Sequence, residues 1–416
     1  MSILNVNKIN PVGGGSTITI AGIASVTNNI SVGNSVTAGS FVGPIEGAVT
    51  GNVTGNVTGN VTGNADTASG LSGNPSINTT GIVTATSFVP TVGQLSHRNV
   101  IINGAMLISQ RGTSSTTSGY ATVDRFAVQF GGTDEAATQA QVDVASGTSP
   151  YTNGFRKALK ITNGNQSSGA GAADYIRYRI RLEAQDIANS GWNYTSSSSY
   201  ITLSFWIKSS VAQNFYGHLH AVDGTQQGYP FETGSLTADT WTKITKTIPG
   251  NSNLTFNNDN ALGLEISIYG YLGTDYTASG VSSNAWAAWS SSTYTTDQTS
   301  TWWTTNDATL ELTGVQLEVG SVATPFEHRS AGDELIRCQR YYQQYVNPCC
   351  TGVIPDNGSK AYSIGLQFQT RMRAVPTLTI TNAGTGGNVS DGQSTQFISA
   401  LNAAAVSYTH LRAHET

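Results

Sequence analysis

The chain has 416 residues, of which 38% are hydrophobic and only 11% are charged, and its formal net charge is −5. A typical soluble protein carries about 25% charged residues, and here 46 glycines with many Ser, Thr and Asn residues take their place. This composition indicates a β-rich, turn-rich protein with a neutral surface of the extracellular kind. The negative charge argues against a nucleic-acid partner, which would require a basic face.

Two further classes of protein are disfavoured by the sequence. No apolar run is long enough to span a membrane, and the start, MSILNVNKI, does not resemble a signal peptide. We therefore expect no membrane insertion, and release by cell lysis, as for a virus particle, fits better than ordinary secretion. The three cysteines, Cys338, Cys349 and Cys350, predict neither a disulfide framework nor a zinc site.

Residues 1–95 are repetitive, and residues 51–64 read GNVTGNVTGNVTGN. Gly and Asn disfavour a helix, and the even period places Val53, Val57 and Val61 on one face of an extended strand. One copy cannot bury this thin apolar strip. We therefore expect an intertwined homo-oligomeric β-shaft with these valines as the seam between copies. A flexible, solvated linker is the alternative.

Residues 96–329 have the texture of a globular domain. Turn clusters separate expected strands at 100–108, 123–130, 176–182, 200–207, 215–222, 240–248, 262–269 and 309–319. One helical turn is expected at 186–190. Many strands with almost no helix indicate a mainly β fold, namely a jelly-roll β-sandwich.

Residues 330–405 are expected to form a small α+β tip domain that is incomplete. Residues 330–346 (SAGDELIRCQRYYQQYV) predict a helix, because apolar side chains recur at helical spacing and Ser330 with Asp333 resembles a capping box. Strands are expected at 361–369 and from residue 376 onward. Residues 406–416 depart from this pattern, resemble translated sequencing-adaptor read-through and are interpreted as a non-native tail.

Four tryptophans lie in polar, loop-like sequence before the last expected strand of the sandwich. Trp286 and Trp289 occur in NAWAAW, and Trp302 and Trp303 occur in TWWT. Indole faces stack on sugar rings, and neighbouring amides and hydroxyls hydrogen-bond sugar hydroxyl groups. These four residues form the candidate carbohydrate-binding site. The alternative is that they plug the end of the sandwich or line a subunit interface.

Metal and catalytic sites are weakly indicated. His218 and His220 share one face of an expected strand, but a metal site normally needs three or more ligands, so we favour a polar strand face. No carboxylate pair, phosphate-binding loop or nucleophile elbow stands out in the sequence. We therefore assign no catalytic residue and expect no enzyme activity.

Several stretches carry a resemblance to a known family. They are residues 99–112 (NVIINGAMLISQRG), 120–126 (YATVDRF), 314–328 (GVQLEVGSVATPFEH), 334–342 (ELIRCQRYY) and 372–377 (MRAVPT). In this order they resemble a domain of bacteriophage tail-fibre proteins, especially those of marine phages. The GNVTGN array resembles the shafts that precede such domains. The resemblance implies a virion fibre protein, usually trimeric, that presents a host-binding tip.

Two stretches of the sandwich resemble a second family. Residues 240–249 (TWTKITKTIP) and 310–319 (LELTGVQLEV) resemble strands of carbohydrate-binding modules. This resemblance implies a structural calcium held by an acidic pair just before the last strand. Thr313 and Gly314 stand at those positions here, so Glu311 and Glu318 are the weak calcium candidates. No other cofactor is expected.

The sequence leads to one preferred hypothesis and two alternatives. The preferred protein is a tail fibre of a phage virion that attaches to a host cell-surface glycan. Its partners are further copies of itself, in a homotrimer, and other virion tail proteins. The first alternative is a glycan depolymerase tailspike, which needs two carboxylates facing the tryptophan loops. The second is a bacterial surface adhesin or an enzyme-linked glycan-binding module.

Overall fold

The computed structural model describes residues 97–345, 352–356, 359–363, 368–377, 388–390 and 395–397. All of them belong to one unit of the chain, Ala85–Thr416. The predicted shaft seam at Val53, Val57 and Val61 lies outside the described residues, as does the predicted tail at 406–416. The shaft, the tail and the domain boundaries drawn from them stay predictions.

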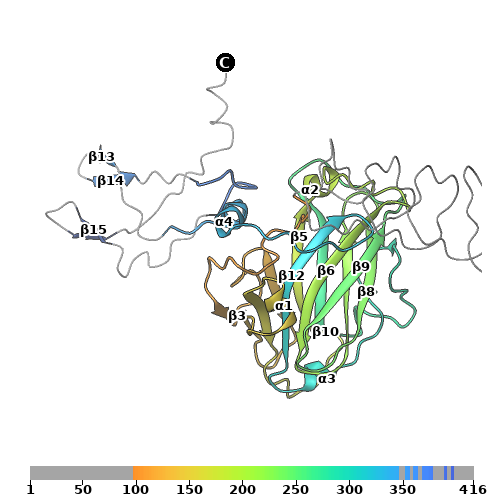
Figure 1. The fold of residues 1–416 in the computed structure, drawn as a ribbon. Coiled ribbons are helices and arrows are strands. Elements are labelled where there is room, and N and C mark those ends of the chain that lie inside the picture. The colour runs from red at the N-terminus through yellow and green to blue at the C-terminus, as the bar shows by residue number, and fades with distance from the viewer. Residues whose placement is uncertain are drawn as a thin grey trace, which may run out of the picture. The chain divides into compact units, whose positions relative to one another are not determined.

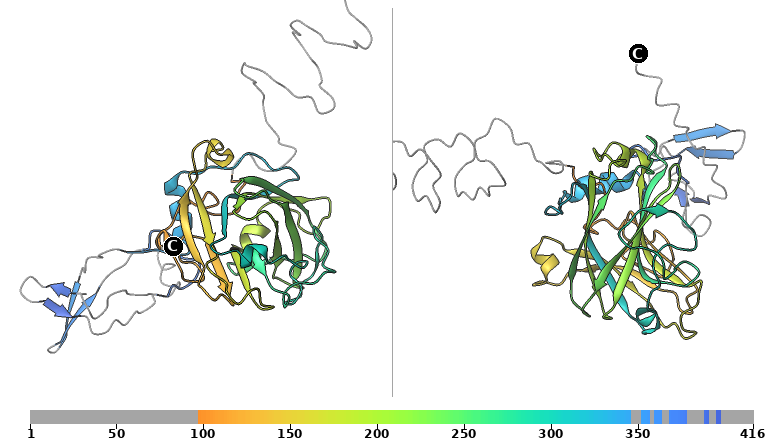
Figure 2. Two further views of the ribbon diagram at one scale, coloured as in Figure 1. Left: turned by 90° about the horizontal axis from the view of Figure 1, so that it is seen from below. Right: turned by 90° about the vertical axis from the view of Figure 1, so that its right-hand side faces the viewer.

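Two six-stranded antiparallel sheets form a β-sandwich, so the predicted mainly β fold is confirmed (Figures 1 and 2). In spatial order, sheet A contains β1 (Ser114–Ser115), β3 (Thr138–Asp143), β4 (Lys157–Thr162), β12 (Thr309–Val319), β6 (Tyr200–Ser209) and β9 (Thr242–Pro249). Sheet B contains β11 (Ala287–Ala288), β8 (Gln227–Ser235), β7 (Asn214–Ala221), β10 (Leu262–Leu272), β5 (Tyr175–Glu183) and β2 (Phe126–Gly131).

Strand alternation builds the core between the two sheets. In β5, Ile176, Tyr178 and Ile180 are buried, whereas the arginines between them point away from the core. Tyr178 donates its hydroxyl hydrogen to the carbonyl oxygen of Leu159 in β4 at 2.9 Å, which ties sheet B to sheet A. Because side chains alternate with period two, each strand also builds the outer face of its sheet. The outer face of sheet B holds the candidate site.

Most expected strands are present, and the exceptions have physical reasons. Residues 100–108 are not a strand but a series of turns that contacts β12 through Val100 N to Leu317 O and Val315 N to Gly104 O, both at 2.9 Å. Asn103 adopts a φ of 61° there, which a strand does not allow. The sequence did not indicate β3, β4 and β8, because TQAQVD and KALKIT contain few β-branched and no aromatic residues and β8 contains a proline.

Four helices occur in the described residues: α1 (Ser149–Thr152), α2 (Ala184–Ala188), α3 (Thr301–Thr304) and α4 (Ala331–Gln339). The single turn predicted at 186–190 corresponds to α2. The side chain of Ser330 accepts a hydrogen bond from Asp333 N, so the predicted cap of α4 is confirmed. The helix nevertheless ends at Gln339 and not at residue 346. No helix in this part of the chain is long and apolar enough to cross a membrane.

The early end of α4 follows from contacts with the sandwich. Arg340 forms an ion pair with Glu183 at 2.8 Å, and the hydroxyl of Tyr341 donates to the same carboxylate. The guanidinium of Arg125 lies 3.4 Å from the centroid of the Tyr341 ring. These contacts hold the residues after Gln339 against the end of β5 and replace the next helical turn. Beyond them, β13 (Gly352–Asp356) pairs with β14 (Ser359–Ser363), and β15 (Asn388–Ser390) pairs with β16 (Thr395–Phe397).

Candidate functional site

Trp302 and Trp303 are core residues, which corrects their prediction as sugar-binding residues. They lie in α3 at one end of the sandwich, and their exposed fractions are 0% and 1% (Figure 1). The indole N–H of Trp302 donates to Thr309 O at 3.0 Å, and that of Trp303 donates to Gly169 O at 2.6 Å. Neither indole face is accessible to a sugar. The alternative interpretation, a plug at the end of the sandwich, describes this pair.

Trp286 anchors the long loop after β10 to the core. Its indole N–H donates to Pro249 O at 2.7 Å, and its ring centroid lies 5.2 Å from that of Tyr229. The side chain is half-buried and packs against the main hydrophobic core. Trp286 therefore holds the loop in place, and its polar group already has a protein partner.

Trp289 lies on the outer face of sheet B within a series of aromatic contacts. Its ring is stacked on His220, with centroids 3.7 Å apart and planes 9° apart, and on Tyr294, with centroids 4.6 Å and planes 17° apart. Tyr294 is in turn stacked on Tyr276 at 5.6 Å. All four side chains are half-buried and so keep part of their surface exposed. We call His220, Trp289, Tyr294 and Tyr276 the aromatic series.

Short backbone contacts fix the position of Trp289. Strand β11 pairs with β8 just before it, and the backbone N–H of Trp289 donates to Gln226 O at 2.9 Å. Its ring then lies over Gly228 of β8, where an added Cβ atom would stand 2.9 Å from Trp289 Cε3. Glycine at position 228 thus makes room for the indole, and the ring reaches His220 on the neighbouring strand.

A row of charged side chains lies beside the aromatic series on the same face. Glu265 of β10 pairs with Arg181 at 2.9 Å and with Arg177 at 3.3 Å, both from β5. The strand register places Glu265 between Arg181 and His220. We call Arg177, Arg181 and Glu265 the charged row. Aromatic rings next to guanidinium and carboxylate groups form a surface that offers both stacking and directed hydrogen bonds.

The two histidines lie on the same face of β7, with ring centroids 6.5 Å apart. Burial, with the positive charge of Arg177 and the neighbouring imidazole of His220, lowers the pKa of His218 well below its usual range. Burial also lowers the pKa of His220. His218 Nδ1 lies 3.1 Å from the hydroxyl of Tyr269. Among the described residues, no group of three or more His, Cys, Asp or Glu side chains could hold a metal ion.

The calcium candidates do not fit a cation site. Glu311 pairs with Lys208 at 2.9 Å across β12 and β6. Glu318 is 1% exposed and accepts hydrogen bonds from the side chain of Gln316 and from both the backbone N–H and the hydroxyl of Thr324. The protein's own donors therefore engage both carboxylates, whereas calcium needs several free, converging oxygens.

Trp289 and His220 lie 69 positions apart in the sequence, so their stacking is visible only in the folded chain. The arginines of the charged row could have been identified from the sequence. The strand YIRYRIRLE places Arg177, Arg179 and Arg181 on one face with period two. Three arginines on the solvent side of one strand indicate a strand, and they also indicate a face that can bind polar groups.

Known proteins resemble this chain in fold alone. The sequence matches no protein-family model and no curated protein. The structure is similar to the enzymatically active domain of tailspike protein 4 from Bacteriophage CBA120, with 7% identity and a TM-score of 0.27 over 53% of this chain and 21% of that chain. This chain thus spans about a fifth of the length of that tailspike chain.

Two carbohydrate-binding modules are also similar in structure. The N-terminal cellulose-binding domain of Cellulomonas fimi β-1,4-glucanase C is 12% identical, with a TM-score of 0.25, and the match covers 52% of this chain and 99% of that one. TmCBM61, solved in complex with β-1,4-galactotriose, is 10% identical with a TM-score of 0.25 over 53% and 97%. TM-scores this low carry no argument about function, which therefore rests on the side chains themselves.

Proposed function

We propose that this protein is a non-enzymatic, glycan-binding tail-fibre protein of a phage virion and that the outer face of sheet B binds the sugar. The observation that carries this proposal is the aromatic series beside the charged row. Sugars present apolar C–H faces and polar hydroxyl edges, and the two groups of side chains match these two surfaces.

The fibre part of the proposal is supported by the sequence. The ordered motifs from residue 99 to residue 377 resemble tail-fibre domains, and the GNVTGN array resembles their shafts. Three copies of the chain would present three equivalent sugar sites in one particle. Such multivalency compensates for the weak affinity of a single sugar site, because linked sites raise the effective concentration. The host glycan and the other virion tail proteins are the remaining proposed partners.

The side chains of the site favour binding over hydrolysis. A glycan hydrolase needs two carboxyl groups placed on either side of the bond that is cut. The charged row contains one carboxylate, Glu265, and two guanidinium groups engage it. Glu265 is therefore held as an ion pair and is not free to transfer a proton or to attack a sugar. We propose on this ground that the site binds its glycan without cleaving it.

A glycan array with the full chain tests the sugar site. We expect binding to at least one glycan and an affinity loss of about tenfold or more in Trp289→Ala, since stacked aromatic contacts dominate such sites. Trp241→Ala is the matched control, because Trp241 is another half-buried tryptophan that packs with residues of the smaller core cluster. If Trp289→Ala binds normally while circular dichroism shows native structure, the site assignment is wrong.

Analytical ultracentrifugation of the full chain tests the fibre assembly independently. The proposal predicts a stable trimer. A stable monomer at micromolar concentration would contradict the fibre, but it would leave the sugar site on sheet B untouched.

A further inference from the structure

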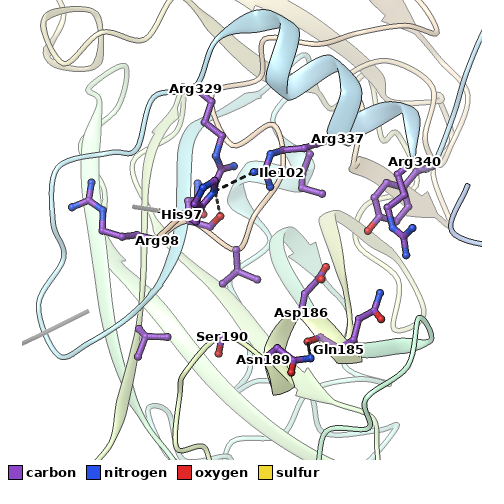
Figure 3. Close-up of a pocket in the computed structure, with 14 residues that line it drawn as sticks. His97, Arg98, Ile102, Gln185, Asp186, Asn189, Ser190, Arg329, Arg337 and Arg340 are labelled. Atoms are coloured by element: carbon purple, nitrogen blue, oxygen red, sulfur yellow. Dashed lines mark hydrogen bonds between the residues drawn. The ribbon is translucent and has the colours of Figure 1, made fainter. Parts of the chain in front are cut away.

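A pocket of about 480 Å³ is lined by residues of α2 and of α4 with its flanks (Figure 3). Both helices lie at the end of the sandwich opposite α3 (Figure 1). His97 and Arg98 line the pocket from the segment that enters the sandwich, and Arg329, Arg337 and Arg340 line it from α4 and its flanks. Gln185, Asp186 and Asn189 lie opposite them in the close-up (Figure 3). The pocket shares none of its lining residues with the aromatic series or the charged row.

The concentration of arginines in this pocket is unusual for this chain. The whole sequence contains only 20 Lys and Arg residues, and four arginines line this one cavity. Asp186 is the one acidic residue of the lining. On a surface with so few charges, four arginines around one cavity form a local excess of positive charge, which favours an acidic ligand.

Two of the four arginines have acidic partners inside the protein. Arg329 pairs with Glu327 at 2.9 Å and with Glu334 at 3.2 Å. Arg340 pairs with Glu183 at 2.8 Å, and although burial alone would raise it, the contacts from Arg340 and Tyr341 lower the pKa of Glu183. These buried pairs hold the pocket wall together, and their charges are already compensated.

The other two arginines have no carboxylate within ion-pair distance among the described residues. Arg98 donates one bond, to Pro325 O at 3.1 Å, and its buried Nε atom has no partner. The guanidinium of Arg337 lies 3.3 Å from His97 Nδ1, which carries no negative charge. A buried donor without a partner is costly, and a guanidinium fork fits a carboxylate or a phosphate. Arg98 and Arg337 are thus the two groups available for an anion.

We propose that this pocket binds an anionic sugar residue, whose carboxylate or phosphate group is attracted by Arg98 and Arg337 from different sides of the lining. The volume falls within the range of about 300–1,000 Å³ that is typical of small-molecule sites. The side chain of Asn189 donates to Gln185 O and Asn258 Oδ1, and its own Oδ1 remains an acceptor for a sugar hydroxyl. The α2 side of the pocket would form hydrogen bonds with the hydroxyl groups of the sugar, and the arginine side would bind its negatively charged group.

Isothermal titration calorimetry of the full chain at low ionic strength tests this inference with glucuronate, inorganic phosphate and glucose. We expect an anion to bind and glucose not to bind, with an affinity that falls as salt is added, because salt screens exposed charges. Stronger binding of glucuronate identifies a carboxylate sugar as the ligand. Stronger binding of phosphate identifies a phosphate-substituted sugar.

Matched variants locate the binding. Arg98→Gln and Arg337→Gln should each weaken anion binding about tenfold, because each loses a charge-assisted contact. Lys243→Gln, an exposed change on the edge strand β9, is the charge control and should bind normally. Unchanged binding in both arginine variants, equal binding of glucose, or no binding of either anion at millimolar concentration would overturn the inference.

The same experiment separates this pocket from the site on sheet B. Trp289→Ala should leave anion binding in the pocket unchanged. If anion binding is lost in Trp289→Ala but retained in the arginine variants, the anion binds on sheet B and the pocket assignment is wrong.

Discussion

The two tryptophan pairs of this chain lie in similar polar sequence but differ in burial and in contacts. Trp302 and Trp303 are fully buried, with both indole N–H groups bonded to backbone carbonyls. Trp286 and Trp289 are half-buried on a loop that covers sheet B, and Trp289 belongs to the aromatic series. The difference shows that polar neighbours in the sequence do not decide whether a tryptophan is exposed, because the packing partner comes from a distant strand.

The largest expected effect concerns the buried pair. Trp302→Ala should lower the free energy of unfolding by about 3–5 kcal/mol, because it leaves a cavity in a rigid core. Gly270 lies against this ring, because an added Cβ atom there would stand only 2.7 Å from Trp302 Cζ3. The core around the indole is therefore tightly packed. Urea denaturation measures the change, and Trp302→Phe gives a milder variant if the alanine variant does not fold. An effect no larger than that of Trp289→Ala would contradict the contrast between the pairs.

The next largest effect is a pH dependence beneath the aromatic series. Burial lowers the pKa of His218 in the folded chain, so the unfolded chain binds a proton more readily. Stability should therefore be full at neutral pH and fall as the pH drops below the unfolded value of about 6.5, by up to about 1.4 kcal/mol per pH unit. Urea denaturation between pH 7.5 and pH 5.5 measures this slope, and His218→Asn should flatten it. An equal slope in that variant would assign the effect to other groups.

A smaller effect is expected at Trp286. Trp286→Phe keeps most of the ring contact with Tyr229 but removes the hydrogen bond to Pro249 O. The free energy of unfolding should fall by about 0.5–1.5 kcal/mol. Glycan affinity should change little, because the loop stays anchored by β11. A large loss of glycan affinity in this variant would show that Trp286 contacts the sugar.

The smallest effect on stability should come from Gly228→Ala. This variant tests whether the position of the Trp289 indole matters for glycan binding. An added methyl group would stand 2.9 Å from Trp289 Cε3 and would displace the indole. We expect glycan affinity to fall about threefold to tenfold, equivalent to roughly 0.7–1.4 kcal/mol. Ser235→Ala at the exposed end of β8 is the control. Normal glycan affinity in Gly228→Ala would mean that the position of Trp289 does not matter for binding.

The sequence predicted the sandwich well because strand alternation is a local signal. The alternating residues of β5, β6, β7, β10 and β12 were enough to place these strands. The segment at 100–108 was predicted wrongly as a strand. Its apolar residues resemble those of a buried strand, but the segment forms turns, and Asn99 and Asn103 hold it against the sandwich. The hydrogen bonds of these two asparagines to segments more than 200 positions away have no local signature.

The candidate site could be predicted only in part. Trp289 and the histidines of β7 were noticed as residues, but their stacking depends on the register between β7, β8 and β11. The pairing of Glu265 with two arginines likewise depends on the neighbourhood of β10 and β5. Strand order in a sandwich is set by long-range contacts, so a constellation that spans several strands becomes visible only in the folded chain.

The most direct test of the central claim is a crystal structure of the chain with the best glycan from the array. The proposed function predicts a sugar ring on the outer face of sheet B, in contact at about 4 Å with Trp289, Tyr294 or Tyr276. A glycan bound elsewhere, with the aromatic series and the charged row free, would contradict it.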